Sequence, residues 1–296
     1  MQDTSPTPHE QRLAFIVGSP RSGTTWLQKL LAAHPDVHTG QESDLFDMYL
    51  GPLLRNWNTY KLPTGRGVLG LACYLTEEEF RASLETFMRM LLEPMLAFVG
   101  PGQLFVEKTP SHALYIPEIL SLLPDARFIH LVRDPREVAL SMIQASRTWG
   151  SDWAPSTARD AARMWAEHAG AVQNVKALLN EANFLEMRYE DLLQSPEAGL
   201  AKALDFLDLS ALPTQIKAMV ERNTLEKSHA GKDTPLAYRG EARKVTGQDI
   251  VVEPEGFAGE GETDGWRSAL DSRQQRDIED VAGNLMRQFG YLPERL

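Results

Sequence analysis

The sequence predicts an α/β fold in which a mainly parallel sheet is covered by helices on both faces. Short apolar runs bounded by turn residues alternate along the chain with longer amphipathic segments. The first apolar run, residues 13–17, precedes a turn rich in Gly, Ser and Pro and then a segment suited to a helix. That order of strand, glycine turn and helix is typical of the first unit of a nucleotide-binding α/β protein.

The remaining elements follow from the same kinds of pattern. Pro35 ends the first helix, because proline disfavours the helical conformation in the residue before it. Thr76 and Glu79 form a capping-box pattern at the start of another helix, whereas residues 231–265 are rich in Gly, Glu and Asp and are expected to be mostly loop. In chain order we predict strands at 13–17, 104–106, 127–132 and 184–189, and helices at 25–33, 76–93, 134–143, 157–180 and 197–206.

Composition restricts the class of protein. The chain has 296 residues and no linker, repeat or low-complexity tract, so we expect one domain over residues 1–296, with its core at about 13–193 and a flexible stretch at 1–12. A net charge of −11 disfavours a nucleic-acid binder. The single cysteine, Cys73, excludes an intramolecular disulfide and any multi-cysteine zinc site.

Hydropathy bears on location. No apolar run approaches the ~18–20 residues that span a membrane, so we expect no membrane span. Residues 1–12 are polar and lack the apolar centre of a secretory signal. These observations favour a cytoplasmic protein.

The loop of residues 18–25 matches most of the phosphate-binding pattern G-x-x-x-x-G-K-[ST]. Gly18 and Gly23 have the right spacing and Thr25 takes the final hydroxyl position, but Thr24 replaces the lysine. Glycines allow successive N–H groups to face one anion at the positive end of the following helix. The missing lysine disfavours a kinase or ATPase and favours a nucleotide with a single 5′-phosphate. The alternative is that the two glycines only form a tight turn.

The segment Pro20-Arg-Ser-Gly-Thr-Thr-Trp-Leu27 resembles the 5′-phosphosulfate loop of sulfotransferases that use 3′-phosphoadenosine 5′-phosphosulfate (PAPS). In motif style it is closest to the bacterial tailoring and tyrosylprotein members. The resemblance implies a P-loop-like three-layer sandwich and PAPS as sulfonate donor, with 3′-phosphoadenosine 5′-phosphate (PAP) as product. It also implies that Arg21 contacts the bridge between phosphate and sulfonate, that Ser22, Gly23, Thr24 and Thr25 hold the 5′-phosphate, and that Trp26 packs on the adenine.

Two further segments resemble the same family in the same order. Arg133, after a predicted strand, and Ser141, eight residues on, match the pair that holds the donor's 3′-phosphate. A guanidinium can bind phosphate with two parallel hydrogen bonds, which suits this role. Tyr189 matches a tyrosine that lies against the adenine. The alternative for Arg133 is a surface ion pair with Asp134 or Glu137.

The C-terminal third matches less well. Gly265-Trp-Arg267 resembles an element that closes over the 3′-phosphate, so Arg267 is a further candidate for donor binding. The residues before it, 253–264, are acidic where many relatives are basic. Arg243 and Lys244 are therefore alternatives to Arg267.

Sulfonate transfer needs a base for the acceptor's proton and cations for the charge on the sulfonyl group and leaving phosphate. The resemblance assigns the cations to Arg21 and to Lys108, in a Lys-Thr element at a predicted strand end. The histidine used by cytosolic members falls on Pro110, whereas the glutamate used by tyrosylprotein and bacterial tailoring members falls on Glu42. His112, as base or helper, and Glu107 are the rivals of Glu42.

The acceptor is not identified by the sequence. Aromatic residues that could line an acceptor pocket or simply fill the core are Phe46, Tyr49, Trp57, Tyr60, Tyr74, Trp149 and Trp153. We expect a small-molecule or peptide acceptor with a hydroxyl or amine, no metal, no nucleic acid, and a monomer or homodimer. The alternatives to a sulfotransferase are a P-loop nucleotide kinase and a non-catalytic protein that binds PAP or another nucleotide.

Overall fold

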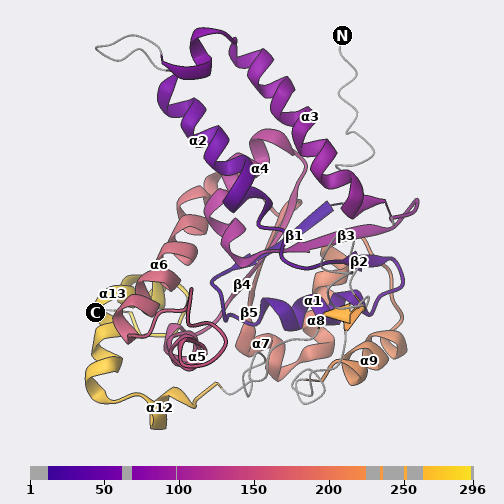
Figure 1. Ribbon diagram of the computed structural model, residues 1–296. Coiled ribbons are helices and arrows are strands. Elements are labelled where there is room, and N and C mark those ends of the chain that lie inside the picture. The colour runs from indigo at the N-terminus through magenta and orange to yellow at the C-terminus, as the bar shows by residue number, and fades with distance from the viewer. Residues whose placement is uncertain are drawn as a thin grey trace.

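A five-stranded parallel sheet forms the centre of the protein (Figure 1). The computed structural model describes residues 13–61, 69–97, 99–224, 234–235, 250–251 and 263–294. The sheet has the strand order β2-β3-β1-β4-β5, and every neighbouring pair is parallel. Its strands are β1 (Leu13–Gly18), β2 (Val37–Thr39), β3 (Leu104–Lys108), β4 (Arg127–Val132) and β5 (Phe184–Arg188).

Four of these strands confirm the prediction, and β2 is the one that the sequence did not indicate. β2 has three residues, too few for a period-two pattern to be recognised. Its place is set by pairing with β3, where Val37 lies opposite Leu104, and by a bond of 2.7 Å from the Thr39 hydroxyl to the carbonyl of Val106. Tertiary pairing therefore produces this strand rather than local preference.

All five predicted helices are present. They are α1 (Thr24–Ala32), α3 (Glu77–Leu96), α5 (Pro135–Ser146), α6 (Ala158–Val175) and α8 (Pro196–Phe206). The prediction of 157–180 as one helix was too long, because α6 ends at Val175 and a 3₁₀ turn, Lys176–Leu178, follows. No helix in the described part of the chain is both long and apolar enough to cross a membrane.

Several helical segments were not predicted. They are α2 (Gly51–Tyr60), α4 (Ile116–Leu122), α7 (Tyr189–Gln194), α9 (Pro213–Arg222), α12 (Trp266–Ala269), α13 (Ser272–Gln288), a π-helix at Leu45–Leu50 and 3₁₀ turns at Gly70–Cys73 and Pro110–Tyr115. Within the expected loop 231–265, Thr234–Pro235 (β6) pairs with Ile250–Val251 (β7). Most of that loop, with Arg243 and Lys244, and the expected flexible stretch 1–12 lie outside the described residues.

The three layers follow from the alternation of side chains along β1. Leu13, Phe15 and Val17 pack with α2, α3 and α4 on one face of the sheet. Ala14 and Ile16 point to the other face and pack with α1 and α8. A third cluster joins α5, α6 and α13 beside the sheet. The expected three-layer sandwich is therefore confirmed (Figure 1).

The chain reverses its direction of winding at β1, since β3 lies on one side of it and β4 on the other. In open parallel sheets, ligands bind at the carboxyl ends of the strands beside such a switch point. The predicted site residues lie at or directly after the ends of all five strands: the loop 19–23, the segment 40–44, Lys108, Arg133 and Tyr189. The topology therefore brings them to one edge of the sheet.

Candidate active site

The loop between β1 and α1 needs glycine at both ends. Gly23 has a φ of +90°, and a Cβ there would lie 2.4 Å from Cδ2 of Tyr189. A Cβ on Gly18 would lie 2.5 Å from the carbonyl oxygen of Leu131. Both distances are shorter than real Cβ contacts, so the two glycines allow the loop to pack against the next two strand ends. The glycines therefore do form the tight turn of the alternative interpretation, and such a turn is compatible with an anion site.

The same loop presents polar groups suited to a phosphate. Thr24 and Thr25 begin α1, and the first N–H groups of a helix have no partner within it. Ser22 is fully buried, and its hydroxyl has no hydrogen-bond partner among the described residues. A buried hydroxyl without a partner is costly unless a ligand or water satisfies it. The residues present therefore fit a phosphate group.

Three predicted anchors that are far apart in the sequence contact one another. Nε of Arg21 donates a bond of 2.9 Å to the hydroxyl of Ser141, 120 residues away. Nη1 of Arg133 donates a bond of 3.2 Å to the carbonyl of Arg21. Arg21 also has a φ of +70°, a left-handed conformation that is unfavourable for a residue with a side chain. Two cations and a hydroxyl thus surround the phosphate loop.

Arg133 is not part of a surface ion pair. It is 7% exposed, its guanidinium lies 4.4 Å from the ring centre of Tyr189, and Nη2 lies 3.6 Å from Glu137. Asp134 pairs instead with Arg136, at 2.6 Å. The predicted surface pair with Asp134 was therefore wrong, whereas the pair with Glu137 is present but buried.

The two aromatic candidates for adenine binding are buried and adjacent. Tyr189 and Trp26 pack edge to face, with ring centres 5.8 Å apart. The Trp26 indole donates a hydrogen bond of 2.9 Å to the carbonyl of Asn223. Tyr189 begins α7 and does not end β5 as expected. Burial raises the pKa of its hydroxyl, against the lowering effect of Arg133. Their role toward a nucleotide stays a prediction.

Glu42 and Lys108 form an ion pair on the other side of β1. Lys108 is the last residue of β3 and is 4% exposed, and its Nζ donates to Oε1 of Glu42. The Glu42 side chain is 40% exposed. The carboxylate is therefore reachable by a substrate, while the ammonium group is fixed at a strand end.

His112 and Glu107 lie beneath this pair and are shielded from solvent. His112 is 0% and Glu107 1% exposed, with Nδ1 of the ring 2.9 Å from Oε2 of the carboxylate. Burial by itself raises the pKa of Glu107, but His112, Thr109 and Ser43 outweigh it and lower the pKa to about 2. Burial lowers the pKa of His112, and the charge of Glu107 more than compensates and raises it.

The structure places Arg267 at the surface. Its Nε donates a hydrogen bond of 2.7 Å to Asp264, its side chain is 65% exposed, and its guanidinium stacks on Trp266. The backbone N–H of Trp266 donates a hydrogen bond of 3.0 Å to Glu137, which is the ion-pair partner of Arg133. The C-terminal element is thus linked to the anchors through Trp266.

The aromatic residues divide into three groups. Phe46 and Trp57 belong to the core, while Tyr49, Tyr60 and Tyr74 are exposed. Trp149 is half-buried, with its ring centre 5.1 Å from the Arg21 guanidinium and 5.5 Å from the ring of Trp153. Of the candidates for an acceptor pocket, this pair lies beside the predicted sulfonate site.

Sequence reasoning missed the residues that support the site. Ser43 and Thr109 bond to Glu107, and Glu190 accepts 2.9 Å bonds from the backbone of Asp134 and from the hydroxyl of Tyr291. Each of them is a common polar residue next to a recognised motif. Only their position beside residues 42, 107 and 133 could have marked them.

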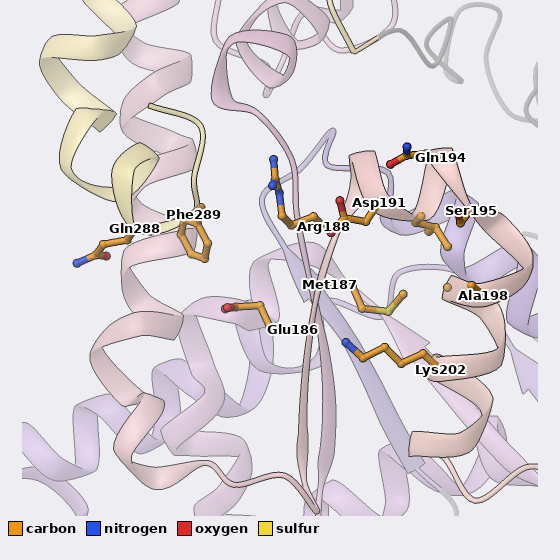
Figure 2. Close-up of a pocket in the computed structure, with 12 residues that line it drawn as sticks. Glu186, Met187, Arg188, Asp191, Gln194, Ser195, Ala198, Lys202, Gln288 and Phe289 are labelled. Carbon is orange, nitrogen blue, oxygen red and sulfur yellow. The ribbon is translucent and has the colours of Figure 1, made fainter. Parts of the chain in front are cut away.

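A separate cavity of about 560 Å³ lies along β5. Figure 2 shows β5 between α8, which carries Lys202, and the end of α13, where Gln288 and the following residue Phe289 lie. Its lining contains none of the predicted site residues and mixes charges of both signs, Arg188 and Lys202 with Glu186 and Asp191. It has no excess of cations for a donor with several phosphates.

The chain belongs to the sulfotransferase family, whose sequence pattern matches residues 14–213. Protein-tyrosine sulfotransferase 1 of Danio rerio is 31% identical over 201 residues, which cover 67% of this chain and 53% of the relative. A putative protein-tyrosine sulfotransferase of Caenorhabditis briggsae is 29% identical over 204 residues, 67% of this chain and 66% of that protein. The chain spans about half to two thirds of the length of these relatives.

Solved structures agree on the fold. A mouse sulfotransferase in complex with PAP superposes with a TM-score of 0.59 at 14% identity, covering 94% of this chain and 85% of that one. The sulfotransferase domain of the Synechococcus olefin synthase gives a TM-score of 0.56 at 22% identity over 96% of both chains. The resemblance carried by the loop and its anchors is confirmed at the level of family and fold.

Proposed function

We propose that this protein transfers a sulfonate group from PAPS to a hydroxyl or amine acceptor by in-line displacement and releases PAP. The observation that carries the proposal is the direct contact of Arg21 with Ser141 and Arg133 beside the glycine loop. A site for one 5′-phosphate would need only the loop. A second cation and hydroxyl at the end of β4 suit a nucleotide that carries another phosphate.

The donor would be held by residues of three strand ends. Gly23, Thr24 and Thr25 would present N–H groups and hydroxyls to the 5′-phosphate, with the buried hydroxyl of Ser22 as a further donor. Arg133 and Ser141 would bind the 3′-phosphate. PAPS, when bound, supplies a sulfonate activated by its anhydride bond to phosphate.

The residues around the sulfonate have separate tasks. Glu42 would accept the proton of the acceptor's hydroxyl as its oxygen bonds to sulfur. Lys108 and Arg21 would stabilise the charge that develops on the sulfonyl and bridging oxygens as the sulfur–oxygen bond to phosphate breaks. Exposure favours Glu42 as base, because a substrate can reach its carboxylate and not the buried groups of His112 and Glu107.

The acceptor is proposed at the level of class. Relatives named protein-tyrosine sulfotransferases support a phenolic hydroxyl, on a peptide or a small molecule. The Trp149–Trp153 pair beside Arg21 supplies an aromatic surface for such a ring.

Ligand-induced thermal shifts test the donor assignment. PAP should raise the melting temperature more than AMP does, because only PAP carries the 3′-phosphate for Arg133 and Ser141. Arg133→Lys should abolish most of that difference, since lysine cannot make two parallel bonds. Arg127→Lys, at the opposite end of β4, is the matched control and should keep the difference between the shifts with PAP and AMP. Equal shifts with PAP and AMP would contradict the proposal.

Turnover of labelled PAPS tests the base. Glu42→Gln should lower kcat by about 10²–10⁴-fold and leave the affinity for PAP within about twofold, because the base acts on the acceptor. Acceptors of several classes, phenols first, are screened with the wild-type protein. Turnover of ATP without any turnover of PAPS would instead support the kinase alternative.

A further inference from the structure

The segment directly after Glu42 has an unusual backbone. Asp44 has a φ of +48°, a left-handed conformation that is unfavourable for a residue with a Cβ. The six residues that follow, Leu45–Leu50, form a π-helix, which is rare and occurs often at functional sites. Such backbone persists only where surrounding contacts hold it.

Glu107 and Thr109 hold the first part of this segment. Oε1 of Glu107 accepts bonds from the Ser43 hydroxyl at 2.8 Å and from the Ser43 backbone N–H at 3.2 Å. The hydroxyl of Thr109 donates 2.6 Å to the same carboxylate oxygen and accepts from Ser43 N at 3.1 Å. Ser43 is therefore held to β3 through its backbone and its side chain.

His112 holds the second part. Nε2 of the ring accepts the backbone N–H of Phe46 at 3.2 Å, while Nδ1 faces Glu107 at 2.9 Å. In the doubly protonated ring, Nε2 would carry a proton and could not accept from Phe46; its nearest carboxylate oxygen would then be Oδ1 of Asp47, 3.5 Å away. The buried ring packs edge to face against both Phe15 and Phe46, and these contacts restrict its orientation.

We propose that Glu107 and His112 are positioning residues for sulfonate transfer: together they hold residues 43–46 so that Glu42 meets Lys108. The inference rests on the proposed function, in which Glu42 is the base. Glu107 and Lys108 are consecutive in β3, and they contact the consecutive residues Ser43 and Glu42. The relative position of base and cation is therefore set by one strand end.

Burial separates this role from catalysis. Neither Glu107 nor His112 is exposed to a substrate, so neither transfers a proton with the acceptor. Their bonds end on the segment that carries Glu42. Loss of those bonds should therefore alter the geometry of the base and leave the donor site around Arg133 unchanged.

Thr109→Val is the mildest test, because it removes the hydroxyl between Glu107 and Ser43 at nearly constant volume. His112→Gln is the second variant. Each should lower kcat by about 10- to 100-fold, since misplacement of a catalytic group by about 1 Å has effects of that size. The KM for PAPS and the affinity for PAP should stay within about twofold.

His130→Gln is the matched control for His112→Gln. His130 is 1% exposed, lies 3.2 Å from the carboxylate of Glu186, and is packed near Phe184 and Phe289, away from Glu42. Both histidine variants should lose stability, but His130→Gln should keep kcat within about twofold. If the two lower kcat equally, or if PAP affinity falls with kcat, the role is structural and the inference is wrong.

A double-mutant cycle with Glu42→Gln decides whether the effect passes through Glu42. Thr109→Val should have almost no further effect on the residual turnover of Glu42→Gln, because the group that it positions is already lost. An equal effect in both backgrounds would overturn the inference. If Glu42→Gln has the same kcat as the wild type, Glu42 is not the base and the proposed function is wrong on that point. If Glu42→Gln is inactive but Thr109→Val is fully active, only the positioning role is refuted.

Discussion

At the scale of single residues, environment decides the role of each group. Glu42 and Glu107 are both glutamates near Lys108, yet one is exposed and the other is buried with its pKa lowered to about 2. A base must be reachable by the acceptor, and of the two glutamates only Glu42 meets that condition. Residue type and spacing do not separate the two, because burial depends on how the chain packs.

Substitution of Gly23 tests the loop at this scale. Gly23→Ala should destabilise the protein by about 2–4 kcal/mol and weaken PAP binding, because it combines a positive φ with a Cβ placed 2.4 Å from Tyr189. Urea unfolding and calorimetric titration with PAP measure the two effects. Gly102→Ala is the control: its φ is +76° with no atom within 4 Å of the Cβ, so it should cost about 1–2 kcal/mol and leave PAP binding unchanged. Equal losses in both variants would contradict the close approach of Tyr189.

At the scale of elements, the first turn of α5 organises the donor site. The helix begins one residue after Asp134, whose side chain caps it by accepting from the N–H of Arg136 at 2.9 Å. Glu137, on the same turn, joins Arg133 to the N–H of Trp266. One helix start therefore connects the 3′-phosphate candidate with the C-terminal element.

Glu137→Ala tests this connection. The change leaves the buried N–H of Trp266 without its acceptor and removes a charge beside Arg133, so stability should fall by about 2–3 kcal/mol. PAP affinity should fall by about tenfold, because Arg133 loses a contact that orients it. Glu197→Ala, an exposed glutamate in the first turn of α8, is the control and should change stability by less than about 1 kcal/mol with no effect on PAP. Unchanged PAP affinity in Glu137→Ala would refute the link.

At the scale of the whole molecule, stability should depend on pH through Glu107. Its pKa of about 2 in the folded protein lies below the ordinary value of 4.5, so its contribution is present above pH 4.5 and is lost as the pH falls toward 2. The shift corresponds to a contribution on the order of 3 kcal/mol. The net charge of −11 does not indicate this, because the effect comes from one buried network.

Comparison of the wild type with Glu107→Gln measures that contribution. The difference in unfolding free energy should narrow as the pH falls from about 5 toward 3, because glutamine does not titrate there. Near neutral pH the difference also changes, because Glu107→Gln removes the charge that raises the pKa of His112. Urea unfolding over a pH series gives both curves. A difference that stays constant down to about pH 3 would show that Glu107 is not ionised in the folded protein.

The parts of the fold that could be predicted have local signals. β1, β3, β4 and β5 are apolar runs between turn residues, and α3 begins at a capping box that the structure confirms. β2 and the π-helix at Leu45–Leu50 lack such signals, because pairing with β3 and bonds to His112 produce them. Tyr189 was predicted at the end of a strand because no turn residue marks the boundary, whereas β5 ends at Arg188 and α7 begins at the next residue, Tyr189.

The sequence by itself determined the class of fold, the phosphate loop and the family, since glycine spacing, strand–helix alternation and the anchors Arg133 and Ser141 are all local patterns. Tertiary structure decided which of these residues meet. It brought Arg21 against Ser141 and Arg133, placed Glu42 on Lys108, and buried His112 with Glu107. The physical reason is that parallel strands bring their carboxyl ends to one edge, whereas burial and pKa depend on neighbours that are distant along the chain.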